Sequence, residues 1–221
     1  MCRRTLVSPE SNFCMRVRIK FCGITRPEDA AAAAAAGADA IGLVFYPDSP
    51  RYVSPAQAAL ICAAVPPFVS RVGLFVNPDR VWVEEVLMTV PLDLLQFHGA
   101  EPASLCTCFG RPYVKGVRVR ESRDIVLADI DHGPAQALLL DAYVTGKQGG
   151  TGVPFSWALI PSGIVHPVIL AGGLTPENVG AAIAAARPFA VDVSGGIENQ
   201  PGIKDSGKMR RFAAAVLQAA N

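Results

Sequence analysis

Short apolar runs alternate with alanine-rich helical stretches along most of the chain. The apolar runs predict strands over 17–21, 40–45, 71–76, 92–97, 113–117, 136–140, 168–171 and 189–193. Runs such as ALLLD and PVILAGG do not alternate between apolar and polar residues, which is typical of parallel strands buried on both faces. Eight β-then-α units predict a single-domain α/β fold, the (β/α)₈ or TIM barrel.

The segments between these runs carry helix signals. Four helices are expected to begin at prolines, which fit the first turn of a helix: Pro27, Pro55, Pro78 and Pro176. Ser54 is a candidate cap for the helix at Pro55. Further helices are expected from about 101 and 122, near 155–160, and over 205–220. An open doubly wound sheet is the alternative fold, but FCGITRPED lacks its glycine fingerprint.

The length of 221 residues suits one barrel domain, expected over 15–221. Residues 1–14 carry no periodic apolar pattern and are expected as a disordered extension, with Met15 as a second plausible start. This segment has no apolar core of a secretory signal, and no apolar run has the length of a membrane span. The sequence therefore predicts one catalytic domain with no membrane partner.

Charge and cysteine content exclude several function classes. The formal net charge is +1 and basic residues form no block, so we expect no nucleic-acid partner. Six cysteines and three histidines show no metal-ligand spacing, so no metal or cofactor is expected. Reduced thiols fit a cytoplasmic protein. The sequence leaves open whether the chain is a monomer or a homodimer.

Candidate chemistry is sought where barrel enzymes carry it, at the carboxyl ends of the strands. Glycine turns follow the seventh and eighth strands, as Gly172-Gly173 and Ser194-Gly195-Gly196. Free backbone N–H groups at such turns bind dianions, so together they predict a phosphate site. The alternative is that these glycines only close tight turns.

Four side chains at other strand ends are candidates for the remaining chemistry. Asp141 ends the apolar run LLLD and could be a general acid or a loop cap. Cys22 could be a base or nucleophile, or simply a small buried apolar residue. Arg51 offers a fork for a carboxylate but could equally be a surface residue. His98 could donate to a substrate or brace its loop.

Eight further segments follow one another in unbroken order from about Val17 to the end of the chain. They are KFCGITRPEDA, GLVFYPDSPRYV, VGLFVN, LQFHGAE, LLLD, GGTGVPFSW, LAGGLTPENV and FAVDVSGGIE. Together these segments resemble the phosphoribosylanthranilate isomerase family of tryptophan biosynthesis.

The resemblance implies an Amadori rearrangement of the small-molecule substrate N-(5-phosphoribosyl)anthranilate to 1-(2-carboxyphenylamino)-1-deoxyribulose 5-phosphate. It implies Asp141 as general acid, Cys22 as general base and Arg51 as the group that holds the anthranilate carboxylate. The two glycine turns would hold the phosphate. The family usually carries D-V-S-S-G in the last turn, whereas this chain has Gly195 in place of the second serine.

Two other functions compete with this interpretation. The bifunctional histidine/tryptophan isomerases resemble this family in fold but carry an aspartate base on the first strand, where this chain has Cys22. A phosphate-ligand-binding barrel without catalysis is a second alternative, but it would need neither Cys22 nor Asp141. Thermal stabilisation by phosphate compounds without turnover would favour the binding protein.

Overall fold

The computed structural model describes residues 16–142 and 155–219. Residues 1–14, which the sequence predicts as an extension, lie outside the described residues. Most of the GGTGVPFSW motif lies outside them as well. The following description concerns the two described ranges.

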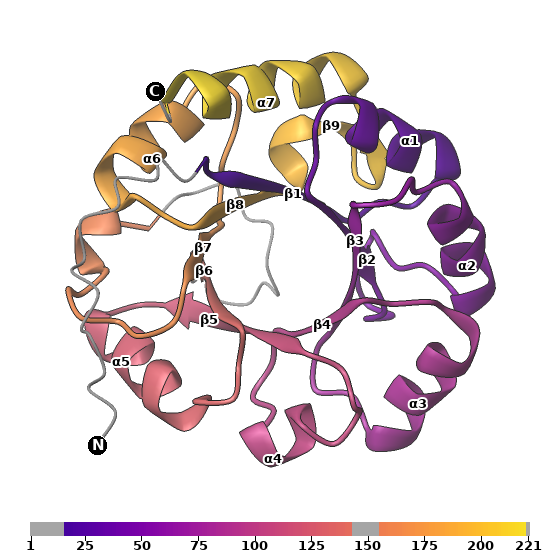
Figure 1. The fold of residues 1–221 in the computed structure, drawn as a ribbon, viewed down its shortest axis with the longest axis horizontal. Helices are drawn as coiled ribbons and strands as arrows, with labels where there is room; N and C mark the ends of the chain where they lie inside the picture. Colours follow the sequence, from indigo (N-terminus) through magenta and orange to yellow (C-terminus); the bar gives the residue numbers. More distant parts are fainter. Residues whose placement is uncertain (1–15, 143–154, 220–221) are drawn as a thin grey trace, which may run out of the picture.

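Eight parallel strands close into a barrel in sequence order, so the predicted (β/α)₈ fold is confirmed. Figure 1 looks down the barrel axis from the end at which the strands begin, with helices forming an outer ring. The strands are β1 (Arg18–Cys22), β2 (Ala40–Val44), β3 (Ser70–Phe75), β4 (Leu94–Phe97), β5 (Tyr113–Val119), β6 (Ala137–Ala142), β7 (Val168–Leu170) and β8 (Ala190–Val193).

Helices α1 and α2 begin at Pro27 and Pro55, as the sequence predicts. Ser54 caps α2 by accepting a hydrogen bond from the backbone N–H of Gln57. The helices and single 3₁₀ turns are α1 (Pro27–Ala35), α2 (Pro55–Ala63), α3 (Arg80–Thr89), α4 (Ala103–Cys106), α5 (Ser122–Asp131), η1 (Trp157–Leu159), α6 (Val179–Ala186), η2 (Gly195–Ile197) and α7 (Ser206–Ala219).

Three expected helices differ from the prediction. Helix α3 begins two residues after Pro78, because the Asp79 carboxylate caps the N–H of Trp82. Helix α6 begins at Val179 instead of Pro176, because Asn178 bonds back to the preceding turn. The helix expected near 155–160 is, in its described part, only the 3₁₀ turn η1. Short local hydrogen bonds therefore override the helix signals at these places.

The strand register decides which side chains face the barrel interior. On β1, Lys20 is in register with Asp192 of β8, and Cys22 is in register with Gly42 of β2. Alternate residues of each strand point to the same face. Large apolar side chains such as Phe21 point outward, where Phe21 meets Phe212 of α7 edge-on. The main hydrophobic core thus lies between the strands and the helices, and charged and small residues occupy part of the interior.

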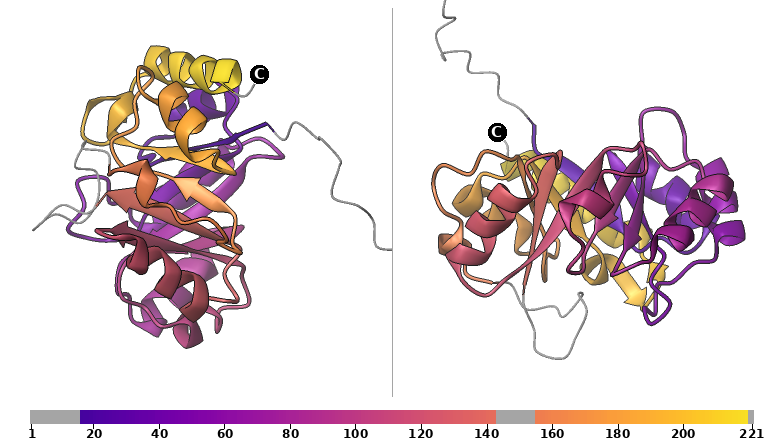
Figure 2. Two further views of the ribbon diagram at one scale, coloured as in Figure 1. Left: turned by 90° about the vertical axis from the view of Figure 1, so that its left-hand side faces the viewer. Right: turned by 90° about the horizontal axis from the view of Figure 1, so that it is seen from below.

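A short hairpin follows the last barrel strand and lies at the carboxyl end of the barrel. Its strands are β9 (Glu198–Gln200) and β10 (Ile203–Lys204), which pair antiparallel. In the right-hand view of Figure 2 it projects downward, away from the end at which the strands begin. The hairpin brings Glu198 and Lys204 back toward β1.

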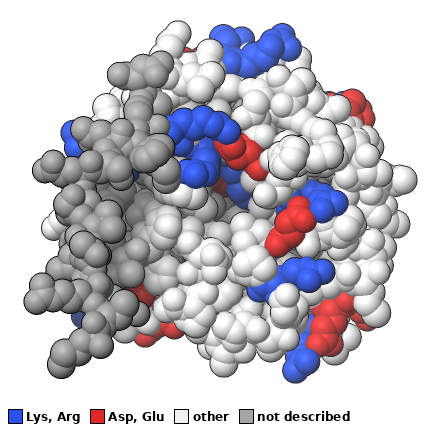
Figure 3. Space-filling model, viewed as in Figure 1, with Lys and Arg blue, Asp and Glu red and all other residues white. Residues whose placement is uncertain are grey.

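The opposite end of the barrel, where the strands begin, faces the viewer in Figure 3. Among the described residues on this face, basic and acidic side chains are interspersed. Arg71, for example, pairs with Asp93. No helix in the described ranges is long and apolar enough to cross a membrane.

Candidate active site

The side chains that the sequence nominates for chemistry meet at the carboxyl end of the barrel. Cys22 of β1, Asp141 of β6, and Arg51, His98 and Ser194 of three loops line one hollow. A second hollow is lined by both glycine turns, Gly172-Gly173 and Ser194-Gly195-Gly196. Asp141, Asp192 and Ser194 line both hollows, so the two adjoin. The barrel therefore brings together, at one end, residues that are far apart in sequence and that the sequence analysis nominated.

Asp141 stands on the β6 side of the first hollow with His98 next to it. One Asp141 oxygen, Oδ1, accepts the N–H of Ala142 at 2.8 Å. The other, Oδ2, lies 3.4 Å from His98 Nε2, which is buried without an aligned hydrogen bond in the described structure. Both groups therefore keep hydrogen-bonding capacity toward the hollow, which a bound ligand could use.

The His98 ring is held from below by Gln96, two residues earlier on the same face of the chain. The Gln96 side-chain amide lies 3.1 Å from His98 Nδ1. With the amide N–H donating, Nδ1 is the acceptor and the proton sits on Nε2, which faces Asp141. Gly116 makes room for this ring, because a Cβ there would lie 2.6 Å from Nδ1.

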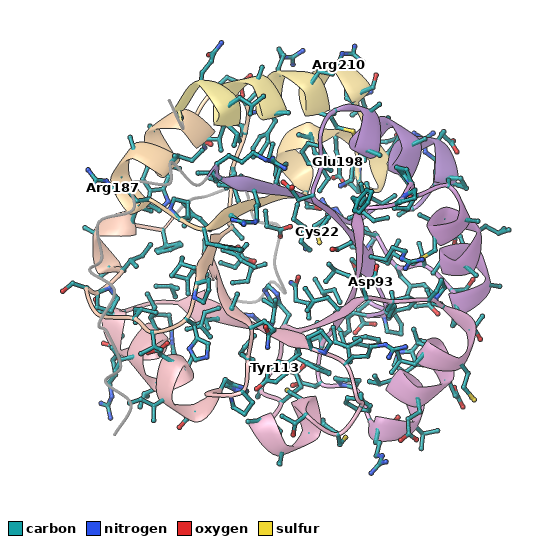
Figure 4. All side chains as sticks on the ribbon, viewed as in Figure 1. Cys22, Asp93, Tyr113, Arg187, Glu198 and Arg210 are labelled. Carbon is teal, nitrogen blue, oxygen red and sulfur yellow. The ribbon has the colours of Figure 1, made fainter. Side chains whose placement is uncertain are left out.

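Cys22 stands on the β1 side of the hollow and is buried, and Figure 4 shows it inside the ring of strands. Lys20 lies two residues before Cys22 on the same face of β1 and forms a 2.8 Å ion pair with Asp192 of β8. Burial raises the pKa of the Cys22 thiol, while the positive charges of Lys20 and Lys204 act in the opposite sense. The thiol is therefore protonated at neutral pH.

Arg51 reaches the hollow from the loop after β2, where it is only partly exposed. Its Nε and Nη2 atoms donate to the two oxygens of Glu198 at 2.8 and 2.7 Å. Figure 4 shows Glu198 on the same side of the ring as Cys22. Because Glu198 uses one edge of the guanidinium, the Nη1–Nη2 edge is left to face a second carboxylate.

Lys204 ties Glu198 to the turn after β8. Its ammonium donates to Glu198 Oε1 at 2.7 Å, and to Ser194 O and Oγ at 3.2 and 3.3 Å. Burial favours the protonated form of Glu198, but Arg51 and Lys204 outweigh it and lower the pKa of that carboxyl. Glu198 is thus ionised between two cations, and Arg51 and the glycine turn are connected through it.

The two glycine turns pack directly against each other. Gly172 and Gly173 have φ of +85° and +64°, which favour glycine, and they direct the chain away from β7. A Cβ on Gly196 would lie 2.0 Å from the carbonyl oxygen of Leu174, so only glycine allows this approach. The hollow between the turns is lined by four glycines, which leave backbone N–H groups accessible to an anion, and also by Asp141 and Asp192.

One wall of the first hollow is apolar, and it lies opposite the glycine turns. It is formed by the ends of β2 and β3 and their loops, through Val44, Tyr46, Leu74 and Val76. The site therefore combines an apolar wall beside Arg51 with a hollow lined by the glycine turns, and Cys22 and Asp141 stand between them. This arrangement suits a ligand with an aromatic acid at one end and a phosphate at the other.

A family model described as N-(5'-phosphoribosyl)anthranilate (PRA) isomerase matches residues 19–215 of the chain. The chain belongs to this family. The N-(5'-phosphoribosyl)anthranilate isomerase of Pseudomonas fluorescens is 59% identical over 203 residues, covering 92% of this chain and 97% of the relative. That of Azotobacter vinelandii is 56% identical, covering 92% and 98%.

Solved structures of PRA isomerases share the fold. That of Thermotoga maritima aligns with a TM-score of 0.84 at 42% identity, covering 90% of this chain and 98% of the other. A second holds reduced 1-(o-carboxyphenylamino)-1-deoxyribulose 5-phosphate, with a TM-score of 0.81 at 41% identity and coverage of 90% and 98%. The predicted family and barrel are thus confirmed.

Sequence reasoning missed the four ionic residues that surround Cys22 and Arg51 in this member of the PRA isomerase family. They are Lys20, Asp192, Glu198 and Lys204. A signal for the first two was available, because a charge in an apolar strand such as RIKFC or AVDV must find a partner. Closure of the barrel places β1 beside β8, so these two charges are natural partners.

Proposed function

We propose that this chain isomerises N-(5'-phosphoribosyl)anthranilate, with Asp141 as general acid, Cys22 as general base and the two glycine turns holding the phosphate. The observation that carries the proposal is the placement of one carboxyl and one thiol across a hollow that adjoins a second hollow lined by the two glycine turns. The reaction moves only protons and electron pairs within one molecule. Two positioned acid–base groups therefore suffice for it.

In the first step, Asp141 gives its proton to the ribose ring oxygen. The bond from C1′ to that oxygen breaks, and the lone pair of the anthranilate nitrogen forms a C1′–N double bond. The open-chain product is a cationic Schiff base. The carboxylate left on Asp141 can be held by His98, whose Nε2 lies 3.4 Å from it.

In the second step, the Cys22 thiolate takes the proton from C2′. The electron pair of that C–H bond forms a C1′–C2′ double bond, and the nitrogen regains its lone pair, which gives an enolamine. Transfer of the C2′ hydroxyl proton to C1′ then yields the ketone. The atoms of the substrate are conserved, so the reaction is an intramolecular oxidation and reduction.

The acid and the base must share one proton between them. In the reactive state this proton is on Asp141, and Cys22 is ionised. A thiol is a weaker acid than a carboxyl, so the pair loses its last proton where the thiol titrates. The alkaline limit of activity is therefore set by the Cys22 thiol, whose pKa burial raises.

The rest of the site positions the two ends of the substrate. The Nη1–Nη2 edge of Arg51 binds the anthranilate carboxylate, and the apolar wall of Val44, Leu74 and Val76 packs on the ring. The N–H groups of the turns after β7 and β8 bind the phosphate. Gly195 supplies a backbone donor in that turn without a side-chain hydroxyl.

The test is a fluorescence assay that follows the loss of freshly made phosphoribosylanthranilate in the presence of EDTA. The purified chain is expected to turn over the substrate. Absence of turnover by the folded protein, with thermal stabilisation by phosphate compounds, would instead indicate a binding protein. Turnover that appears only after addition of a divalent metal would contradict the mechanism.

Two variants test the assigned roles. Cys22→Ala and Asp141→Asn should each lower kcat by about 10²–10⁴-fold with a much smaller change in KM, the usual worth of a positioned acid or base. Cys62→Ala is the matched control, since Cys62 is also buried but lies on α2, on the outside of the barrel. If Cys22→Ala keeps kcat within about threefold of the parent, the thiol is not the base.

A further inference from the structure

The proposed mechanism leaves unexplained a charged pair buried directly below its base. Lys20 and Asp192 are in contact at 2.8 Å, with side chains 7% and 9% exposed. Removing two charges from water costs more than a single contact commonly returns, so a buried pair is weak evidence of stabilisation. The burial of Lys20 and Asp192 next to the proposed base therefore suggests that the pair has a function other than stabilising the fold.

The geometry places the Lys20 ammonium next to the Cys22 sulfur. A Cβ on Gly42 would lie 2.7 Å from Cys22 Sγ and 3.1 Å from Lys20 Nζ, so these two atoms flank one small space. They are within about 6 Å of each other, the range in which an opposite charge strongly favours an ionised group. Nζ donates a hydrogen bond to Asp192 Oδ1 at 2.8 Å. Gly42 is what allows this close approach.

The charged groups facing Cys22 in the described part of the chain have an uneven balance. Lys20 of β1, Lys204 of β10 and Arg51 of the β2 loop are cations, and Asp192 of β8 is an anion. Glu198 of β9 pairs with both Arg51 and Lys204. Arg118 and Asp141 line the same hollow, so four basic side chains stand against three acidic ones around Cys22.

We propose that Lys20 and Asp192 are a positioning pair for the base. Lys20 stabilises the Cys22 thiolate, and Asp192 holds the Lys20 ammonium in place and partly offsets its positive charge. The proposal rests on the proposed function, because it assigns these residues to the base of that reaction. When Cys22 takes the C2′ proton, the thiolate becomes a neutral thiol and Lys20 is left paired with Asp192 alone. The ammonium itself transfers no proton.

The directions of the ionisation shifts agree with this arrangement. Burial would lower the pKa of Lys20, but the Asp192 carboxylate and Cys22 outweigh it, so the pKa is raised and the ammonium stays charged. At Cys22, burial raises the pKa, Lys20 lowers it and Asp192 raises it. The two members of the pair thus act on the thiol with opposite signs.

The experiment is a pH titration of thiolate absorbance in the ultraviolet, without substrate. Each variant is measured against the same variant carrying Cys22→Ala, so that only the Cys22 signal remains in the difference. Lys20→Met should move the titration to higher pH and lower the thiolate fraction about tenfold or more at a given pH. Asp192→Asn should move it to lower pH.

Lys115→Met is the matched control. Lys115 is likewise a buried strand lysine in a 2.6 Å ion pair, with Glu101, but it lies outside the barrel and away from Cys22. It should leave the Cys22 titration unchanged although it breaks a comparable pair. In steady-state assays, Lys20→Met should lower kcat about tenfold or more with little change in KM, and move the alkaline limit of kcat/KM upward.

Shifts of the Cys22 titration to higher pH in Lys20→Met and to lower pH in Asp192→Asn support the proposal. If the pair were purely structural, the two variants would not shift the titration in opposite directions. Shifts in the same direction, or an unchanged titration in either variant, would overturn it. If Lys20→Met does not fold, Asp192→Asn alone still tests the sign. The titration needs no turnover, so a chain that fails to isomerise the substrate refutes the proposed function without affecting this result.

Discussion

Gly196 and Gly195 are neighbours in the turn after β8, yet the structure predicts opposite outcomes when each receives a methyl group. Neither has a φ in the left-handed region, so backbone strain does not distinguish them. A Cβ on Gly196 would lie 2.0 Å from Leu174 O, whereas the nearest atom to a Cβ on Gly195 is Arg51 Nη2 at 3.5 Å. Gly196→Ala should therefore disrupt the phosphate site and Gly195→Ala should not.

The magnitude follows from the distance. Real Cβ atoms do not approach within 3.0 Å of such an oxygen, so the two turns must separate by roughly 1 Å. Overpacking of this kind costs about 1–3 kcal/mol, which for a chain of this length lowers Tm by about 2–12 °C. A displacement of about 1 Å at a positioning group can cost about 10²-fold in kcat/KM.

The assay compares both variants and the parent by thermal unfolding, with and without inorganic phosphate, and by steady-state kinetics. Gly196→Ala is expected to lose both stability and phosphate protection, and Gly195→Ala to keep both. Gly195→Ser adds the hydroxyl that the family pattern implies and should bind phosphate at least as well as the parent. If Gly196→Ala retains full phosphate protection and kcat/KM, contact between the two turns does not build the site.

Two further predictions concern the ends of the substrate. Glu198→Gln should raise KM about tenfold with kcat nearly unchanged, since loss of one charge-assisted partner of Arg51 is worth about 1.5 kcal/mol; an unchanged KM in a folded variant would show that Glu198 does not orient Arg51. Gly173→Asp should abolish competition by inorganic phosphate, because a carboxylate would take the place of the dianion; equal protection of this variant by phosphate in thermal unfolding would refute the assignment of the anion site.

Much of the fold and the nominated site could be predicted because both follow from local pattern. Apolar runs without alternation predict parallel strands, and eight of them close a barrel. The same topology places the carboxyl ends of all strands at one rim, so Cys22 and Asp141 meet although 119 positions separate them. The prediction of a helix near 155–160 was wrong for the described part of that segment, which forms only a 3₁₀ turn.

The sequence did not predict the ion pairs around Arg51, because they depend on a structure outside the repeating pattern. Glu198 and Lys204 lie on a two-stranded hairpin that follows the eighth strand, and no periodicity marks two strands of three and two residues. The hairpin returns toward β1 and places a carboxylate on the guanidinium of Arg51. The side chain that is assigned to a substrate carboxylate thus also binds a carboxylate of the protein itself.

Small residues inside the barrel explain why so many polar groups fit at its mouth. Gly42 and Gly116 are interior positions of β2 and β5, where a Cβ would come within 2.7 Å of Cys22 Sγ and 2.6 Å of His98 Nδ1. Interior glycine weakens a strand and has no side chain to pack. At these two places it leaves the space that a functional side chain needs. A glycine inside a barrel strand is therefore evidence about its neighbours, and that evidence appears only when the register of the strands is known.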